Sequence, residues 1–268
     1  MAEAVVGERA ALARSVLNLP GVDIEVFQGG EGPVLLFLHG GGGLQADAPF
    51  LRLLSKRFRV VAPSHPGFGG SSLPFWMDSV DDFAHVHFDV IDQLKLDHIT
   101  LVGASIGGWT AAEMATKNTS HIDRLVLVSP VGIKVGPVDK LDIPDIFAMA
   151  QEKVERLIYH QPEKWRLDPA KKTDEELLTI ARNRETLTLV TWEPFMHNPK
   201  LNHRLHRIDR PTLILRGASD GLVSQHYAEA YAKLIPGARL DTIPEAGHVP
   251  FLEQPEAFVD RIVRFAGR

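Results

Sequence analysis

The stretch that decides the fold runs from Ile99 to Lys117 and reads ITLVGASIGGWTAAEMATK. It joins a short apolar run to a helical segment through a glycine-rich turn around Ser105. A serine on such a turn must adopt strained backbone angles, and the small residues Gly103 and Gly107 let neighbouring chain pass close by. The turn lifts the hydroxyl clear of a sheet and places the next amides at a helix N-terminus, where negative charge is favoured. The stretch predicts an exposed serine nucleophile, and its plainer interpretation is a glycine-rich turn with a helix-capping serine.

Short apolar runs alternate with longer amphipathic ones along the chain, which predicts βαβ units and an α/β fold with a largely parallel sheet. The alternating pattern of Val22–Phe27 indicates an antiparallel edge strand, and Met1–Pro20 reads as a short helix. Buried strands are expected at Val34–Leu38, Val60–Ala62, Ile99–Val102, Leu125–Val128, Thr212–Leu215 and Leu240–Ile243. Helices are expected at Phe50–Lys56, Val80–Leu94, Ile106–Lys117, Gln225–Leu234 and Pro255–Phe265.

One interval, residues 131–205, contains no convincing buried strand. Helices are expected there at Pro144–Tyr159, Thr173–Leu189 and Lys200–Leu205. About 75 residues are too many for a bare loop. We therefore expect a helical cap over the carboxyl edge of the sheet, where open α/β sheets bind ligands. The catalytic core would comprise residues 1–130 and 206–268, and the cap residues 131–205.

Composition excludes several classes of function. The 268 residues carry 29 Lys and Arg against 34 Asp and Glu, a net charge of −5 that gives no reason to bind nucleic acid or anionic lipid. The chain has no cysteine, which excludes disulfide scaffolds, thiolate metal sites and cysteine nucleophiles. No apolar run approaches the ~20 residues of a membrane span, and the first residues lack the apolar core of a signal peptide. These features predict a cytoplasmic protein without membrane partners.

A serine hydroxyl is a poor nucleophile, so it needs a base and a group that orients the base. His248, in the stretch EAGHVPF after the run Leu240–Ile243, is the candidate base. Asp220, in RGASDG after Thr212–Leu215, is the candidate acid because its loop leaves the same edge of the sheet. Glu245 is the rival acid, three residues before His248.

A glycine run, HGGGG at residues 39–43, follows the strand expected at Val34–Leu38. An amide of this loop, paired with the amide of Ile106, can stabilise an oxyanion, and losing one such donor costs ~3–4 kcal/mol of transition-state stabilisation. A glycine run can also hold a phosphate, but no nucleotide-binding glycine pattern is present, so a nucleotide site is not expected.

Together these motifs, with the PGFGGS turn at residues 66–71, resemble the α/β-hydrolase superfamily over essentially the whole chain. The chain order of serine, aspartate and histidine is the one described for that superfamily. The resemblance implies an eight-stranded, mostly parallel sheet with helices on both faces and a cap inserted after the sixth strand. It also implies these roles: Ser105 as nucleophile, His248 as base, Asp220 as its orienting acid, and the amides of Gly41 and Ile106 as oxyanion donors, with Gly42 as the alternative first donor.

Two positions depart from the family pattern. Ser64 and His65 precede the PGFGGS turn where many members carry an aspartate, and Ile106 stands where many have methionine. Only the backbone amide of Ile106 is used, so the proposed roles are unaffected. His39 resembles the loop-bracing histidine of the family, and His65 is expected to support its turn. The serine at the elbow disfavours the dehalogenase and epoxide hydrolase branches, which use aspartate.

Apolar side chains in and near the cap favour an apolar acyl or alcohol pocket. Any one of them could simply pack the cap on the core. The pocket candidates are Trp76, Phe147, Trp165, Trp192, Phe195 and Met196.

These expectations predict a serine hydrolase of carboxylic esters that needs neither metal nor cofactor. Alternatives with the same machinery are hydrolysis of a carbon–carbon bond in a dienone ring-cleavage product, or of a lactone or thioester. A small-molecule receptor that turns over very slowly is the alternative from another class. No residue pattern specifies the oligomeric state.

Overall fold

The computed structural model describes residues 12–267. Eight strands form one sheet in the order β1-β2-β4-β3-β5-β6-β7-β8. β1 and β2 are antiparallel to their neighbours and all the other pairs are parallel. The predicted eight-stranded, mostly parallel α/β architecture is therefore confirmed. The strands are β1 Ala13–Leu19, β2 Val22–Gly29, β3 Val34–Leu38, β4 Arg59–Pro63, β5 Ile99–Ala104, β6 Ile122–Val128, β7 Thr212–Gly217 and β8 Arg239–Ile243.

The N-terminal prediction was wrong where the structure describes it. Ala13–Leu19 forms strand β1 and not a helix, because it pairs along its whole length with β2. As a result the strand expected at the edge, Val22–Phe27, lies one place inside the sheet, between β1 and β4. Residues 1–11 of the predicted helix lie outside the described part of the chain.

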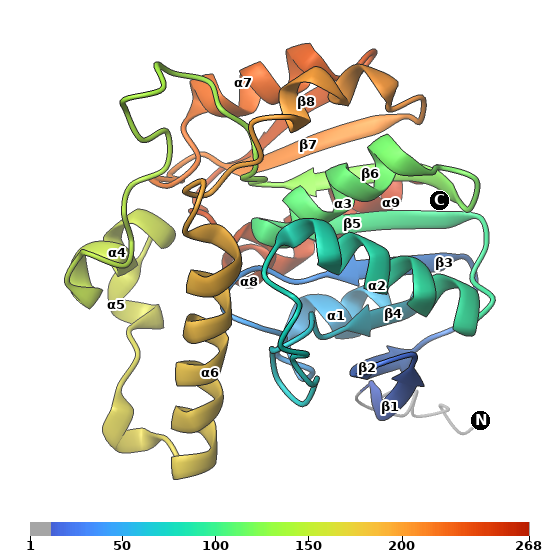
Figure 1. Ribbon diagram of the computed structural model, residues 1–268, viewed down its shortest axis with the longest axis horizontal. Coiled ribbons are helices and arrows are strands. Elements are labelled where there is room, and N and C mark those ends of the chain that lie inside the picture. Colours follow the sequence, from blue (N-terminus) through green and yellow to red (C-terminus); the bar gives the residue numbers. More distant parts are fainter. Residues whose placement is uncertain (1–11, 268) are drawn as a thin grey trace, which may run out of the picture.

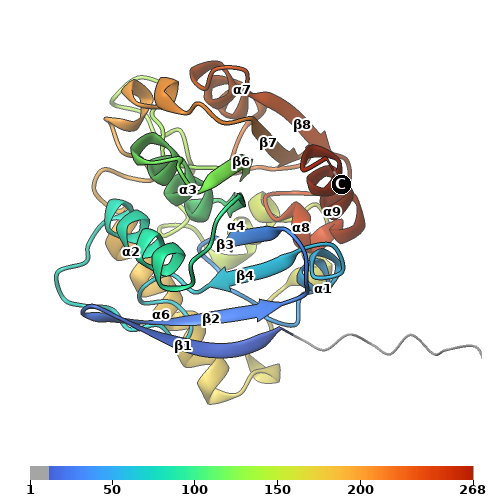
Figure 2. The same ribbon diagram turned by 90° about the vertical axis from the view of Figure 1, so that its right-hand side faces the viewer.

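Helices cover both faces of the sheet, and the alternation of side chains along the strands separates two apolar cores. Leu36 and Leu38 of β3 pack in the core under α2, α3 and α7, whereas Leu35 and Phe37 face α1, α8 and α9. Figure 2 shows α2 and α3 on one side of the sheet and α1, α8 and α9 on the other. The bounds are α1 Pro49–Leu54, α2 Val80–Gln93, α3 Ile106–Lys117, α7 Gln225–Leu234, α8 Pro250–Glu253 and α9 Pro255–Phe265.

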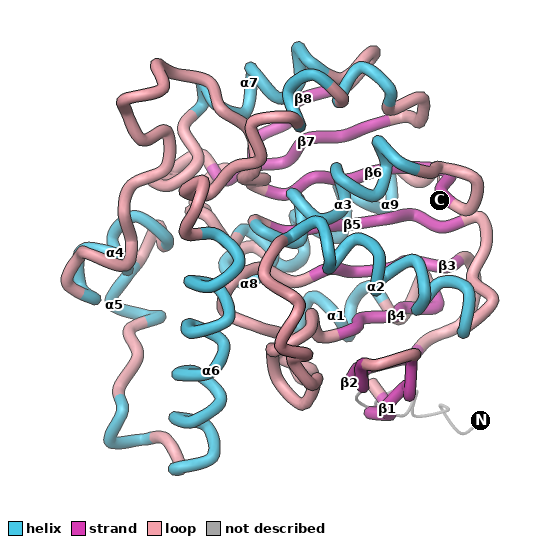
Figure 3. Tube along the Cα trace, in the orientation of Figure 1, coloured by secondary structure: helices cyan, strands magenta, loops and turns pink. Residues whose placement is uncertain are grey.

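Between β6 and β7 the chain makes a long excursion, residues 129–211, which we call the inserted segment. Figure 1 shows α4, α5 and α6 of this segment standing beyond the edge of the sheet at which β6 ends, and Figure 3 shows the loops that connect them. It contains α4 Gln151–Ile158, α5 Pro162–Trp165, α6 Asp174–Thr191 and the short 3₁₀ helices η1 Pro169–Lys171, η2 Leu201–His203 and η3 Leu205–Arg207.

Two helices predicted in this segment differ from the structure. The helix expected at Pro144–Tyr159 begins only at Gln151, because the Asp145 carboxylate accepts hydrogen bonds from the amides of Phe147 and Ala148 at 3.0 and 3.1 Å and closes a turn instead. The stretch expected as one helix at Lys200–Leu205 is divided between η2 and η3. Among residues 12–267, no helix combines the length and the apolarity that crossing a bilayer requires.

Candidate active site

The loops that follow the parallel strands converge at one edge of the sheet, as expected for an open α/β sheet. Ser105 follows β5, Asp220 follows β7 and His248 follows β8. A cavity of about 300 Å³ lies at this edge, between these loops and the inserted segment. Ser105 and His248 both line it.

Ser105 occupies a strained turn between β5 and α3. Its backbone angles are φ 54° and ψ −114°, a conformation that costs a non-glycine residue on the order of 1–3 kcal/mol. Two glycines allow this turn to pack. A Cβ atom on Gly103 or on Gly107 would lie closer than 3.0 Å to the backbone oxygens of Gly107 and Leu38, respectively. The spacing of these two glycines around the serine is therefore a steric requirement.

His248 and Asp220 form a buried pair. The Nδ1 atom of His248 lies 3.1 and 3.2 Å from the two carboxylate oxygens of Asp220. The Asp220 carboxylate also accepts the amides of Leu222 and Val223, each at 2.9 Å. Burial alone would raise the pKa of Asp220, but the charge and hydrogen bond of His248 and the Val223 amide outweigh it, so the pKa lies below its usual value. The carboxylate is thus ionised at neutral pH and holds the proton of His248 on Nδ1.

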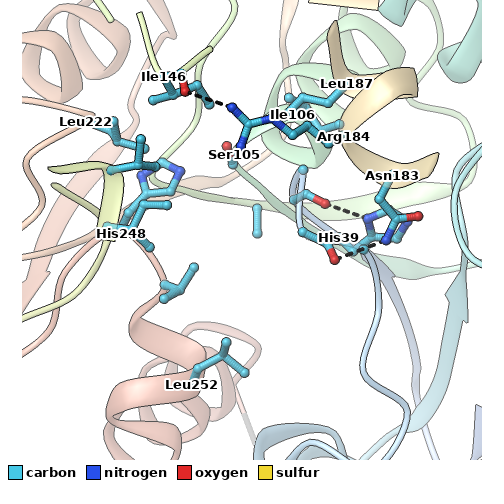
Figure 4. A pocket seen from close by; sticks show the side chains of 18 of the residues that line it. His39, Ser105, Ile106, Ile146, Asn183, Arg184, Leu187, Leu222, His248 and Leu252 are labelled. Atoms are coloured by element: carbon cyan, nitrogen blue, oxygen red, sulfur yellow. Dashed lines mark hydrogen bonds between the residues drawn. The ribbon is translucent and has the colours of Figure 1, made fainter. Parts of the chain in front are cut away.

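The remaining ring nitrogen of His248, Nε2, is then free to accept a proton from the direction of the cavity. Figure 4 shows His248 and Ser105 at the same hollow, from opposite sides. Within the described residues no hydrogen bond joins the two side chains. Hydrogen bonds between a nucleophile and its base often tighten only when substrate is bound.

The rival acid, Glu245, lies away from this pair. It is exposed, and its carboxylate forms no hydrogen bond or ion pair within residues 12–267. Only its backbone carbonyl is engaged, by the Gln254 amide at 3.0 Å. The geometry favours Asp220 as the partner of His248.

The glycine loop, residues 40–43, forms the wall next to Ser105. The amide of Gly43 donates to the carbonyl of Gly40 at 3.0 Å and closes a tight turn. A Cβ atom on Gly40 would lie 3.3 Å from the Cβ of Ser105. Within the described chain the amides of Gly41, Gly42 and Ile106 donate to no acceptor, so these backbone groups are available to a developing negative charge.

Three buried histidines support the glycine loop from beneath. The Nε2 of His39 accepts the amide of His65 at 2.9 Å, so its Nδ1 carries the proton and donates to the Gly40 carbonyl at 2.7 Å. The Nε2 of His65 lies 2.9 Å from the His39 carbonyl, and its Nδ1 lies 2.7 Å from Nε2 of His87. The Nδ1 of His87 is buried and has no partner among residues 12–267. The network agrees with the expected role of His39 as a support of its loop, whereas the ring of His65 contacts His39 and His87 and forms no hydrogen bond to its own turn within the described residues.

All three rings are neutral near pH 7. Burial lowers the pKa of His39 to about 4, against the opposing effects of its bond to Gly40 and of Glu25. Burial and the charge of His39 lower the pKa of His87 to about 3. Burial, with the two neighbouring rings, also holds the pKa of His65 well below its usual value. No group of three potential ligand side chains in the described range could hold a metal ion.

The inserted segment contacts the loops of the acid and the base. The amide of His248 donates to the Ile158 carbonyl at 2.6 Å, and the amide of Gly221 donates to the Leu157 carbonyl at 2.9 Å. Both acceptors lie at the end of α4. The segment therefore covers the cavity and also holds the loops of Asp220 and His248 in place.

Of the six apolar side chains predicted for the pocket, the structure places Phe147 and Met196 at the cavity wall. The other four do not line it: Trp76, Trp165, Trp192 and Phe195.

Three of these four side chains pack behind aromatic residues that line the cavity. Trp192 and Phe195 contact the ring of Phe147, with centroids 6.2 and 6.1 Å away. Trp165 stacks on Tyr159 at 5.8 Å, and Tyr159 is the ring that reaches the cavity. Trp76 lies on the turn before α2 and is 52% exposed.

Sequence reasoning missed the face of α6 that lines the cavity. This face consists of Ile180, Asn183, Arg184 and Leu187. Their i, i+3, i+4, i+7 spacing is the signal of one helix face, and it was available in the sequence. Arg184 matters most for chemistry, because among the described residues it is the one cavity-lining side chain with a permanent charge.

Comparison with known proteins assigns the family. A model of the alpha/beta hydrolase family matches residues 35–261. The chain belongs to the alpha/beta hydrolase family. It is accordingly an enzyme of the hydrolase class, and the predicted fold and family are confirmed.

Curated relatives of this alpha/beta hydrolase have different named activities. The chain is 24% identical to 2-hydroxy-6-oxo-6-(2'-aminophenyl)hexa-2,4-dienoic acid hydrolase of Metapseudomonas resinovorans, over 97% of this chain and 92% of the relative. It is 27% identical to carboxylesterase YbfK of Bacillus subtilis, over 88% of this chain and 80% of the relative.

Solved structures agree with the fold. A membrane phospholipase A, described as a bacterial virulence factor, superposes with a TM-score of 0.80 at 24% identity, covering 96% of this chain and 86% of the other. A serine hydrolase involved in carbazole degradation superposes with a TM-score of 0.77 at 22% identity, covering 96% and 99%.

Proposed function

We propose that this alpha/beta hydrolase is a serine esterase that cleaves carboxylic esters of apolar or mixed substrates through an acyl-enzyme. The observation that carries the proposal is a strained, cavity-facing Ser105 opposite His248, whose Nδ1 is held by the buried carboxylate of Asp220. In this arrangement the serine has a base, and the base has an orienting partner, as nucleophilic catalysis by a hydroxyl requires.

The proposed reaction proceeds in two halves. Ser105 Oγ attacks the ester carbonyl while Nε2 of His248 takes its proton, and the amides of Gly41 and Ile106 stabilise the oxyanion. Collapse of this intermediate breaks the bond to the alcohol, which receives the proton from His248. A water molecule then gives its proton to His248 and attacks the acyl-enzyme, and a second collapse releases the acid and restores the Ser105 hydroxyl.

The lining of the cavity supports apolar groups on the substrate. Apart from the loop backbones and a few polar side chains, the walls are aliphatic and aromatic, with Phe147 and Met196 from the inserted segment and Phe251 from α8. We therefore assign the cap role to the inserted segment, near the expected residues 131–205, and expect it to select the acyl and alcohol groups.

The test is hydrolysis of a series of p-nitrophenyl esters, from acetate to octanoate, by the native enzyme and by Ser105→Ala. Turnover should fall to the uncatalysed rate in Ser105→Ala and stay unchanged in the control Ser120→Ala, an exposed serine outside the cavity. Retained turnover in Ser105→Ala would mean a different nucleophile. If the native protein bound a ligand tightly but turned over every ester negligibly, the result would favour the alternative of a small-molecule receptor.

Arg184 supports a second candidate, hydrolysis of a carbon–carbon bond next to a ketone in an acidic substrate. Arg184 is an exposed residue at the wall of a mainly apolar cavity, and among the described residues its guanidinium donates one long bond, 3.4 Å, to the Ile146 carbonyl (Figure 4). A carboxylate is the natural partner of such a group. The Metapseudomonas relative is named for a dienoic acid, a substrate that carries this group.

Arg184→Met tests for an acidic substrate when it is compared with the native enzyme on neutral p-nitrophenyl butyrate, on a monoester of a dicarboxylic acid and on a 6-aryl-2-hydroxy-6-oxohexa-2,4-dienoate. The preference of the native enzyme among these substrates separates the two candidates. If the natural substrate is acidic, kcat/KM for the anionic substrates should fall at least about tenfold while that for the neutral ester is unchanged. Fast turnover of the dienoate alone by the native enzyme would replace the esterase proposal by the carbon–carbon hydrolase.

A further inference from the structure

One face of α6 rests on two glycine-rich turns of the core. A Cβ atom on Gly41 or Gly43 would lie closer than 3.0 Å to Leu187 or Asn183. A Cβ atom on Gly67, in the turn after β4, would meet Thr186 in the same way. The glycine run next to Ser105 thus leaves room for these side chains of α6 as well as bringing backbone amides near a substrate.

Asn183 joins the two turns through both ends of its amide. The side chain is 5% exposed. Its Oδ1 accepts the amide of Gly69 at 3.0 Å, and its Nδ2 donates to the carbonyl of Gly42 at 3.2 Å. A backbone amide only donates, so it fixes Oδ1 on the Gly69 side and leaves the Nδ2 donor for Gly42. Figure 4 shows this side chain reaching from α6 to the glycine loop.

The glycine loop needs such an anchor. Four consecutive glycines have the largest backbone freedom of any tetrapeptide, whereas an oxyanion donor must sit 2.7–3.1 Å from its charge. From beneath, His39 holds the Gly40 carbonyl; from above, Asn183 holds the Gly42 carbonyl. The amide proposed to stabilise the oxyanion, that of Gly41, lies between these two anchored carbonyls.

A neighbouring bond serves as a control. Thr186, one helical turn further along α6, donates from Oγ1 to the carbonyl of Gly67 at 3.0 Å. Thr186 is as buried as Asn183 and anchors the same helix to the same core. Its bond reaches only the turn after β4 and leaves residues 40–43 untouched.

We propose that Asn183 is a positioning residue for the oxyanion hole, because its bond to the Gly42 carbonyl holds the glycine loop that carries the Gly41 amide. This inference rests on the proposed function, because it assumes that the Gly41 amide stabilises the transition state. Asn183 acts on that amide through the Gly42 carbonyl and need not touch the substrate.

The test compares Asn183→Leu with Thr186→Val on p-nitrophenyl butyrate. Removing an oxyanion donor outright costs on the order of 10²–10³ in kcat. Loosening the loop that holds one donor should cost about 10- to 100-fold. An interaction made only in the transition state lowers kcat and kcat/KM equally, so KM should stay within about twofold. Thr186→Val should keep kcat within about twofold.

A trifluoromethyl ketone supplies a readout that a purely structural role would not move. Its hemiketal with Ser105 carries an oxyanion, so its inhibition constant should rise by the same factor as kcat falls in Asn183→Leu. Melting temperatures of both variants record the loss of hydrogen bonds. If Asn183→Leu does not fold, Asn183→Ala is assayed in its place, because it removes the same bonds without adding bulk.

The inference is overturned if the Asn183 variant raises KM at unchanged kcat, which would make Asn183 a substrate contact, or if both variants lose activity to the same extent. It is also overturned if kcat falls while ketone affinity is retained. Its failure is separate from that of the proposed function. A fluorophosphonate would still label Ser105 in every one of these outcomes, whereas absence of that label from the native enzyme would remove the proposed function itself.

Discussion

Replacing Asp220 by asparagine should inactivate the enzyme without unfolding it. The carboxylate oxygens accept the amides of Leu222 and Val223 and the Nδ1 proton of His248. In Asp220→Asn the amide oxygen can keep both backbone donors, and the NH₂ group must then face Nδ1. The imidazole responds by moving its proton to Nε2, where it can no longer accept a proton from Ser105.

The size of the decrease in kcat follows from this change of tautomer. Restoring the proton to Nδ1 would lose a charge-assisted hydrogen bond and leave two donors opposed in a buried site, at a cost of about 4–5.5 kcal/mol. At about 1.4 kcal/mol per factor of ten, kcat should fall ~10³- to 10⁴-fold. The melting temperature should change little, because the two backbone contacts persist.

The assay is hydrolysis of p-nitrophenyl butyrate at neutral pH, with fluorophosphonate titration to count active sites. Glu245→Gln is the matched control and should stay within about twofold, since its exposed carboxylate has no partner in the described chain. The assignment of the acid would be refuted if Asp220→Asn kept activity within tenfold, or if Glu245→Gln were the more damaging change.

Three further predictions concern stability. The buried neutral rings of His39, His65 and His87 have pKa values below that of an unfolded histidine, so unfolding takes up protons below about pH 6.5. The free energy of unfolding should therefore fall toward pH 4, by up to about 1.4 kcal/mol per pH unit for each ring. Equal urea midpoints at pH 7 and pH 5 would contradict this prediction. Phe258→Ala should lower the free energy of unfolding, measured in urea, by about 3–5 kcal/mol, because its fully buried ring fills the core beneath α9. A decrease below about 1 kcal/mol would show that the surrounding side chains fill the space left by the ring. Gly107→Ala should prevent assembly of the elbow, because its Cβ would overlap backbone oxygens, and a variant with native melting temperature and activity would disprove the steric argument.

The elbow could be predicted from sequence because its constraints are local. Ile106–Lys117 is a helix with the bounds that the sequence predicts, and Ser105 takes the strained angles that its glycine neighbours permit. Asp220 and His248 could be paired for a similar reason. Each follows a strand of the parallel part of the sheet, and parallel strands deliver the residues after them to one edge. β7 is buried as expected, whereas β8 is a half-buried edge strand.

Other elements depend on partners that are distant in the sequence. Strand β1 pairs on one side only, and most of its residues are exposed. Only Leu17 and Leu19 at its end reach the core, so the apolar alternation within Ala13–Leu19 is too short to reveal a strand. The delayed start of α4 is caused by one side chain, Asp145, that competes for the backbone.

The functional face of α6 was missed for the same kind of reason. The helix itself was predicted, but the direction in which Asn183 and Arg184 point is set by how the inserted segment packs on the core. Aromatic content alone was a poor guide to the pocket, since Trp192 and Phe195 lie behind Phe147.

The central claim is that Ser105 is the nucleophile, and covalent labelling tests it most directly. The native enzyme is treated with a fluorophosphonate, digested, and mapped by mass spectrometry. We predict one adduct per chain, on the peptide that contains Ser105, and none on Ser105→Ala. An adduct on another residue, or undiminished labelling of Ser105→Ala, would contradict the account.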